Sequence, residues 1–135
     1  MRIVSTVVAS SIDQCWRAFT DPAQATAWVP GLRTAVVIED GEDGLPHEVQ
    51  FEFAGDLVYS LEYTYDVAAR VVRWEPRAGE SGAVRGFARF EDEPAGEGTL
   101  VTYALEHEAG RKAAERAIDD PRLLVEAFAR MMHER

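Results

Sequence analysis

The hydrophobic pattern along the chain alternates between the period of a strand and that of a helix. Residues 2–9 are rich in β-branched residues, and from 32 to 108 apolar residues recur at every second position, as in half-buried β-strands. Between these stretches, and again over 111–134, apolar residues recur at every third or fourth position, as on one face of a helix. The pattern therefore predicts a strand, a helical segment, a run of strands and a C-terminal helical segment.

The first helical segment carries start and stop signals. Ser11 and Gln14 form a capping box, in which each side chain accepts a hydrogen bond from the other residue's backbone N–H group. Asp21 and Pro22 end this helix and begin another, because Asp caps a helix and Pro suits its first position. The second helix is expected to be short and to end near residues 28–31, where Pro30 and Gly31 forbid continuation. Two short helices are thus predicted between the first two strands.

Turn-forming residues divide the long run into six strands. The breaks are rich in Gly, Pro and Asp and are too short for parallel crossovers, so successive strands are expected to form antiparallel hairpins. With the first strand they predict a seven-stranded antiparallel sheet. The predicted strands lie near 2–9, 32–39, 46–53, 57–67, 70–76, 83–91 and 98–108.

One face of this sheet is predicted to be dry. Alternate positions of the fourth strand are apolar or aromatic: Leu57, Tyr59, Leu61, Tyr63, Tyr65 and Val67. The positions between them are polar, and the neighbouring strands alternate in the same way. This is typical of antiparallel sheets with one wet and one dry face.

The C-terminal segment is predicted to be helical in two pieces. Asp119 or Asp120 caps the second piece, and Pro121 opens it. Its apolar stripe must pack against another apolar surface, and we expect that surface to be the dry face of the sheet. We expect the stripe in the core and Met132 at the surface; the stripe comprises Leu124, Ala127, Phe128 and Met131.

Composition and charge narrow the classes of partner. A chain of 135 residues fits a single domain, 1–135, and an apolar share of 47% is ordinary for a globular protein. A net charge of −10 argues against nucleic acid and against an anionic membrane surface, which both attract Lys and Arg clusters. No apolar run approaches the roughly 18 residues of a membrane helix, so no membrane insertion is expected.

Cysteine usage and the first residues point to a reducing compartment. The single Cys15 cannot form an internal disulfide, and no Cys and His cluster has a metal-ligand spacing. The chain starts without the basic and apolar regions of a signal peptide. We therefore expect a cytoplasmic protein with no metal and no cofactor, either a monomer or a weak homodimer.

Two stretches resemble a known superfamily. Residues 7–22, with Trp16 on the helix and Asp21-Pro22 after it, followed by Trp28-Val29-Pro30-Gly31, resemble the opening of START-like polyketide cyclase/dehydrase and lipid-transport proteins. Gly98-Thr99 and the alternating residues after it are similar to their penultimate element. The resemblance implies an α+β helix-grip (SRPBCC) fold, in which a curved sheet wraps around a long C-terminal helix. It also implies a hydrophobic cavity between them, of about 300–1,000 Å³ in ligand-binding proteins.

The dry face supplies the candidate site. Hairpin arithmetic places His47 opposite Tyr63, and Tyr63 opposite Trp74, in one row across three strands, close enough for one ligand to touch all three. Buried phenols and imidazoles need polar partners, which a ligand can provide. The expected ligand-binding residues are Trp28, His47, Phe51, Tyr59, Tyr63, Trp74, Tyr103, His107, Phe128 and Met131.

Three functions remain open from the sequence. The first is binding or transport of an apolar or aromatic small molecule, lipid included. The second is a cyclase or dehydratase in which His47, Tyr63 or His107 acts as general acid or base, although no catalytic motif fixes such a role. The third is a protein-binding module of the heat-shock ATPase-activator type, whose acidic surface docks a basic partner.

Overall fold

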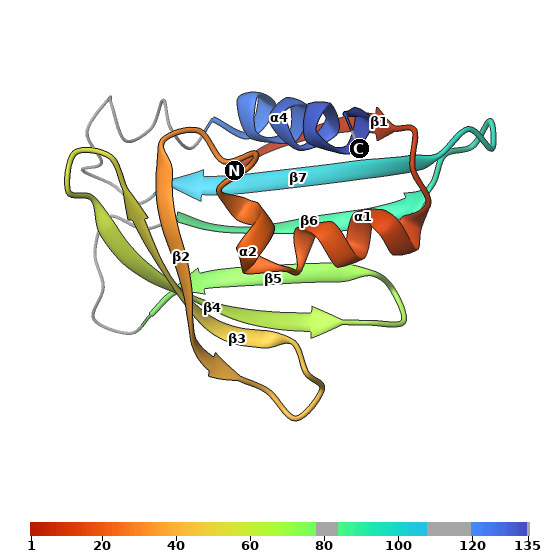
Figure 1. Ribbon diagram of the computed structural model, residues 1–135. Coiled ribbons are helices and arrows are strands. Elements are labelled where there is room, and N and C mark those ends of the chain that lie inside the picture. The colour runs from red at the N-terminus through yellow and green to blue at the C-terminus, as the bar shows by residue number, and fades with distance from the viewer. Residues whose placement is uncertain (78–83, 108–119, 135) are drawn as a thin grey trace.

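A computed structural model describes residues 1–77, 84–107 and 120–134. Its elements are those expected from the hydrophobic pattern, and apart from the end of α2 they begin and end within about two residues of the predicted bounds. In chain order they are β1 (Arg2–Val8), α1 (Ile12–Phe19), α2 (Pro22–Ala25), β2 (Leu32–Asp40), β3 (Pro46–Phe53), β4 (Val58–Asp66), β5 (Val71–Pro76), β6 (Val84–Asp92), β7 (Thr99–His107) and α4 (Pro121–His133) (Figure 1). The first piece of the predicted C-terminal helical segment lies outside the described residues.

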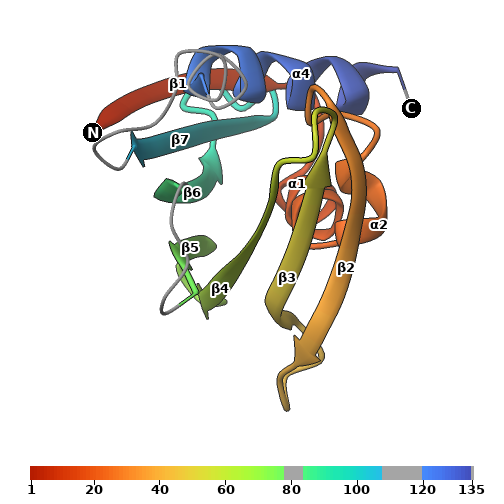
Figure 2. The ribbon, with the colours of Figure 1, turned by 90° about the vertical axis from the view of Figure 1, so that its left-hand side faces the viewer.

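The seven strands form one antiparallel sheet in the order β1-β7-β6-β5-β4-β3-β2. Strands β2 to β7 follow one another as hairpins, and β1 closes the order by pairing with β7, with Ser5 opposite Thr102. The sheet is curved, with α1 and α2 inside the curve and α4 lying across β1 and β7 (Figures 1 and 2). The predicted helix-grip α+β fold is confirmed.

The helix caps form as their sequence signals predict. The Ser11 hydroxyl accepts from the Gln14 N–H, and the Gln14 side chain accepts from the Ser11 N–H, which completes the capping box. The Asp21 and Asp120 carboxylates cap α2 and α4 by accepting from the Ala23 and Arg122 N–H groups. The helix α2 is shorter than predicted: it stops at Ala25, and hydrogen-bonded turns, in which the Trp28 and Val29 N–H groups both donate to the Ala25 carbonyl oxygen, carry the chain to Val29.

The turn between β4 and β5, which contains two plain alanines, is held by polar groups on either side. The Asp66 carboxylate accepts from the Ala69 N–H, and Arg70 adopts a left-handed backbone with φ of 56°. Its guanidinium donates to Asp13 on α1 and lies 5.4 Å from the centre of the Trp16 ring. The turn thereby fastens α1 to the sheet.

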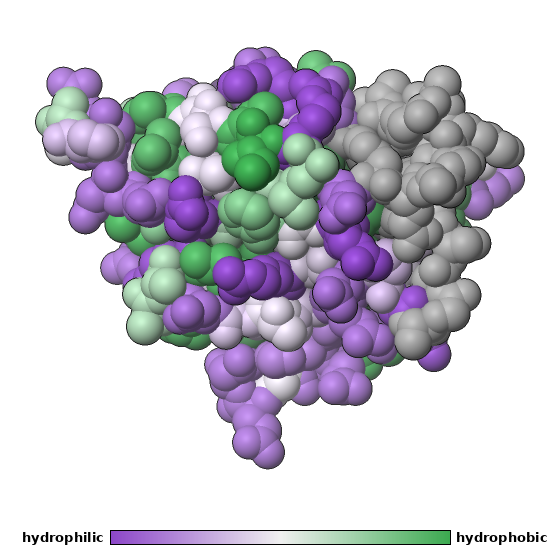
Figure 3. All heavy atoms as spheres, turned by 180° about the vertical axis from the view of Figure 1, so that it is seen from behind, coloured by the Kyte–Doolittle hydropathy of each residue, from purple (hydrophilic) through white to green (hydrophobic). Residues whose placement is uncertain are grey.

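The core lies between the concave face of the sheet and the helices. Phe128 of α4 is 1% exposed, and its ring centre lies 5.7 Å from that of Phe19 and 5.3 Å from that of Trp28. Among the described residues no helix is long and apolar enough to cross a bilayer. From behind, the molecule is mostly hydrophilic, with apolar residues scattered between (Figure 3).

Two expectations about burial were wrong. Met132 is 4% exposed and Met131 is only partly buried, because the buried face of α4 is wider than the predicted stripe and includes Val125 and Ala129. Val67 is 49% exposed, since β4 ends at Asp66 and the chain turns away from the dry face there.

Candidate functional site

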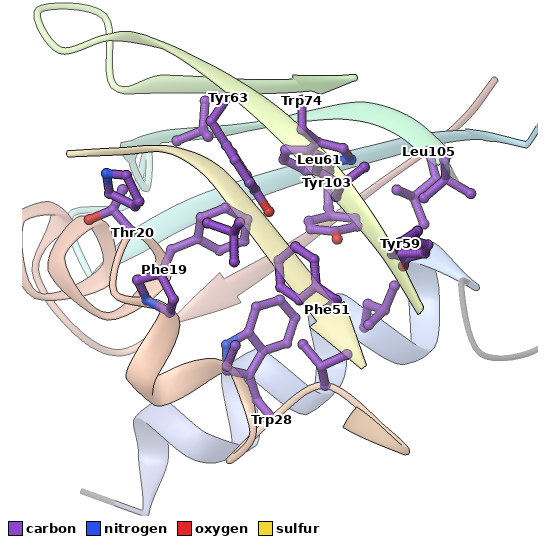
Figure 4. A pocket seen from close by; sticks show the side chains of 18 of the residues that line it. Phe19, Thr20, Trp28, Phe51, Tyr59, Leu61, Tyr63, Trp74, Tyr103 and Leu105 are labelled. Atoms are coloured by element: carbon purple, nitrogen blue, oxygen red, sulfur yellow. The ribbon is translucent and has the colours of Figure 1, made fainter. Parts of the chain in front are cut away.

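A cavity of about 80 Å³ lies between the concave face of the sheet and helices α1, α2 and α4 (Figure 4). The prediction of a larger cavity was wrong, because aromatic rings fill most of the space between the layers. The hollow has room for several water-sized groups. Its lining consists of Phe19, Thr20, Pro22, Ala25, Trp28, Val29, Pro46, Val49, Phe51, Phe53, Tyr59, Leu61, Tyr63, Tyr65, Val72, Trp74, Val84, Tyr103, Leu105 and Leu124.

The sheet contributes a continuous aromatic wall. Tyr63 pairs with Trp74 across β4 and β5, as the hairpin arithmetic predicts, and their ring centres are 6.2 Å apart. Trp74 in turn lies 5.3 Å from Tyr103 of β7. The hydroxyl groups of Tyr59, Tyr63 and Tyr103 point toward the enclosed space (Figure 4). Rings from three strands therefore meet around one hollow.

Burial distinguishes the mouth of the cavity from its floor. The half-buried lining residues mark the side on which the hollow approaches solvent; they are Phe19, Thr20, Pro22, Val29, Phe51, Tyr63 and Tyr65. Val72 and Leu124 are 1% and 3% exposed and form part of the floor. This open side lies beside α2, the start of β3 and the end of β4.

His47 does not line the cavity. It follows the β2–β3 turn, where its Nε2 lies 3.1 Å from the Asp43 carboxylate, and its side chain is 34% exposed. The alternation assigned His47 to the dry face, but the hairpin extends beyond the helices at this end, so the imidazole pairs with the turn instead. The centre of its ring lies 5.5 Å from that of Tyr65, a lining residue, but His47 itself is not part of the lining.

The other predicted site residues divide into three groups. Six line the cavity: Trp28, Phe51, Tyr59, Tyr63, Trp74 and Tyr103. Phe128 lies behind the lining, where it supports Trp28 and Phe19, and Met131 is packed at the margin of the core. The backbone of His107 pairs with Val84, and its side chain lies outside the described residues.

The cavity is uncharged over its described lining, which contains no Asp, Glu, Lys, Arg or His. Burial raises the pKa of the Tyr63 phenol well above its ordinary value, and the neighbouring phenols of Tyr103, Tyr65 and Tyr59 act in the same direction. Burial also raises the pKa of Tyr65, whose hydroxyl donates to the Pro46 carbonyl oxygen at 2.5 Å. These two phenols are therefore neutral hydrogen-bond donors at physiological pH.

One polar atom next to the cavity has no partner. Trp28 is 8% exposed, and its Nε1 is buried without a hydrogen bond to any described residue. Buried polar groups are almost always paired, since an unmade hydrogen bond costs about 1–3 kcal/mol. Among the described side chains, the indole Nε1 of Trp28 is therefore a fully buried polar atom whose hydrogen bond is unmade.

Sequence reasoning missed Phe19, Thr20 and Gly86 as parts of the site. The helical period marks Phe19 as apolar, but only the packing of α1 inside the curve shows that its ring meets those of Trp74 and Tyr103. Gly86 lies opposite Trp74, and a Cβ atom there would lie 2.0 Å from the Ala104 carbonyl oxygen and 3.0 Å from the Trp74 indole. The missing side chain lets the neighbouring strand β7 and the Trp74 ring approach closely, a requirement that no local pattern reveals.

The described residues contain no group of three or more His, Cys, Asp or Glu side chains that would hold a metal ion. Cys15 is buried, and burial raises the pKa of its thiol, so it behaves as a packed core residue rather than a nucleophile.

A curved antiparallel sheet that encloses an apolar hollow with a C-terminal helix defines the START-like class of helix-grip proteins. The chain belongs to the family described as polyketide cyclase / dehydrase and lipid transport, which matches residues 2–135. No protein with curated annotation matches the sequence.

Solved structures share the fold at low identity. A START superfamily protein from Mycobacterium smegmatis is 18% identical with a TM-score of 0.75, and the match covers 98% of this chain and 97% of that one. A Thermus thermophilus protein is 13% identical with a TM-score of 0.78 over 98% and 96% of the two chains. The Zhui aromatase/cyclase of a Streptomyces species is 18% identical with a TM-score of 0.65 over 99% and 94%. At these identities the likeness shows the fold alone.

Proposed function

We propose that the protein binds or carries an apolar, aromatic small molecule in the cavity between the sheet and the helices. The observation that carries this proposal is the uncharged hollow walled by Trp28, Tyr63, Trp74 and Tyr103. Ligand pockets combine apolar and aromatic walls with a few polar groups that orient the ligand, and the phenols supply those groups here. Flat rings fit such walls because aromatic side chains stack at centre distances of about 4.5–7 Å.

The size of the hollow limits the ligand. A volume of about 80 Å³ suits one small ring or the ring-bearing end of a longer molecule. A longer ligand extends through the mouth, where Thr20 and Pro22 are half-buried. Lipids with long straight chains fit this short, ring-walled space poorly.

Binding is favoured over acid–base catalysis by the position of the histidine. A general base must reach the ligand at hydrogen-bond distance, and His47 is held by Asp43 at the turn outside the lining. Among the described side chains, a cyclase or dehydratase would have to work with Tyr63, whose raised pKa keeps its proton in place; the side chain of His107, the third candidate, lies outside the described residues. A filled core would have favoured the protein-binding module, and the hollow argues for a small ligand instead.

We also propose a cytoplasmic location and a monomer or weak homodimer. The buried single cysteine needs no oxidising compartment.

Two measurements test the proposal together. Native mass spectrometry of protein purified from its own cells should show a copurified mass, and benzene titrated in NMR should shift the signals of the cavity residues saturably. The variant Val72→Phe, which fills the floor, should abolish both effects, whereas Val36→Phe, at a position 51% exposed on β2, should leave them unchanged. No copurified mass together with no saturable shift would refute the proposal.

A further inference from the structure

The unpaired indole N–H of Trp28 indicates what kind of group its ligand carries. Trp28 lies just after α2 and packs between Phe19 and Phe128, with ring centres 5.6 and 5.3 Å away. In Figure 4 its nitrogen lies on the edge of the ring turned toward Phe19 and Thr20, the mouth side of the cavity. An indole nitrogen only donates hydrogen bonds, so the group that completes it must be an acceptor.

Tyr63 provides a second donor in the same space. Its ring is held by Tyr65 and Trp74, with centres 6.2 Å away in both cases. No hydrogen bond joins its hydroxyl to another residue in the described parts of the chain, and the hydroxyl points into the hollow (Figure 4). The Tyr65 hydroxyl, by contrast, is already engaged with Pro46.

The absence of charge from the described lining sets the third condition. A carboxylate or phosphate in this hollow would find no Arg, Lys or His to neutralise it. Transfer of an unpaired ion out of water is far more costly than transfer of a neutral polar group. The ligand must therefore be neutral and must accept hydrogen bonds.

From these three observations we infer that the cavity selects a flat, neutral ligand bearing a carbonyl-type oxygen, which accepts a hydrogen bond from Trp28 Nε1, while the Tyr63 hydroxyl serves as a second donor. This inference rests on the proposed binding function and adds to it the chemical class of the ligand. Trp28 is then the residue that determines specificity, because its indole N–H forms a hydrogen bond only with a ligand that carries an acceptor. Apolar molecules of the same shape leave it unpaired.

Three molecules of one shape test this selectivity. Acetophenone carries a carbonyl oxygen, isopropenylbenzene replaces that oxygen with a methylene group, and benzoate replaces the methyl group with a charged oxygen. The wild-type protein should bind acetophenone about tenfold more tightly than isopropenylbenzene, since one hydrogen bond to a buried donor is worth about that factor. Benzoate should show no saturable binding.

Variants assign the effect to Trp28. In Trp28→Phe the preference for acetophenone over isopropenylbenzene should fall to about twofold or less, whereas Trp16→Phe removes a buried indole outside the cavity lining and should keep the preference. In spectra of ¹⁵N-labelled protein, the indole N–H signal of Trp28 is the one that is lost in Trp28→Phe. Acetophenone should shift this signal downfield, and isopropenylbenzene should leave it in place.

The outcomes separate this inference from the function on which it rests. Equal binding of acetophenone and isopropenylbenzene, or tight binding of benzoate, overturns the selectivity and leaves the cavity as a binding site. Failure of all three molecules to bind overturns the cavity function and the inference together. The comparison of ligands on the wild-type protein does not depend on how well any variant folds.

Discussion

Replacement of Phe128 by alanine tests whether α4 closes the sheet as described. The side chain is 1% exposed and contacts the rings of Phe19, Trp28 and Phe90, at 5.7, 5.3 and 6.4 Å between centres. Truncation of a buried phenylalanine costs about 3–5 kcal/mol, which includes the cavity it leaves. Because domains of this size are stable by about 5–15 kcal/mol, the loss should be a large part of the total.

Urea unfolding, followed by tryptophan fluorescence, measures this loss. With a denaturant slope of about 2 kcal/mol/M, the midpoint should fall by about 1.5–2.5 M. Leu123→Ala, on the exposed face of the same helix at a position 50% exposed, is the matched control and should shift the midpoint by less than about 0.3 M. A shift of Phe128→Ala no larger than that of the control would mean that α4 does not pack its Phe128 face onto the concave side of the sheet.

Three further predictions use the same unfolding assay. Gly98→Ala should lower the free energy of unfolding by at least about 2 kcal/mol more than Gly96→Ala. Both glycines have positive φ, but a Cβ at Gly98 would lie 2.2 Å from the Val8 carbonyl oxygen, whereas nothing lies within 4 Å of a Cβ at Gly96. Similar losses in the two variants would contradict the described β1–β7 junction. Ser11→Ala should cost about 1 kcal/mol by removing the capping box of α1, and an unchanged midpoint would mean that the cap contributes nothing. The free energy of unfolding should fall as the pH rises above about 10, because the unfolded chain ionises its tyrosines there while Tyr63 and Tyr65, with raised pKa values, keep their protons. Between about pH 9 and about pH 11 this fall should be smaller in Tyr63→Phe than in the wild-type protein. An equal fall in the two proteins would show that the Tyr63 phenol is not buried.

The fold could be predicted because its signals are local. Alternation in strands such as 57–67, the caps at Ser11 and Asp21 and the Pro at 121 depend only on neighbouring residues, and each marks an element that the structure contains. The pairing of Tyr63 with Trp74 follows from turn length alone. The family resemblance supplied the curvature and the position of the helix.

The site could be predicted only in part, because its details depend on how the layers pack. Alternation correctly placed the tyrosines on the inner face, but it also placed His47 there, since it carries no information about where the hairpin extends past the helices. The unpaired N–H of Trp28 depends on the rings packed around the indole after α2 ends. The small volume of the hollow depends on Phe19, a helix residue that fills space between distant strands.

The buried face of α4 is a second feature that the sequence pattern could not predict. The buried face of α4 is rotated from the predicted stripe toward Val125 and Ala129, so Met131 and Met132, which are adjacent in sequence, were assigned the wrong way round. Which of them is buried depends on β1, whose Ala9 end lies near the last turn of α4 and donates its N–H to His133 Nε2 at 3.0 Å.

The central claim is that the aromatic hollow accepts a small ring. Diffraction from crystals soaked in iodobenzene measures this directly, because iodine scatters anomalously and the anomalous difference map marks the position of the ring. We predict one strong peak inside the space bounded by Trp28, Tyr63 and Tyr103, with the surrounding side chains moved by no more than a rotamer change. Iodine found only on the outer surface, with those rings packed against one another and no space between them, would contradict the account.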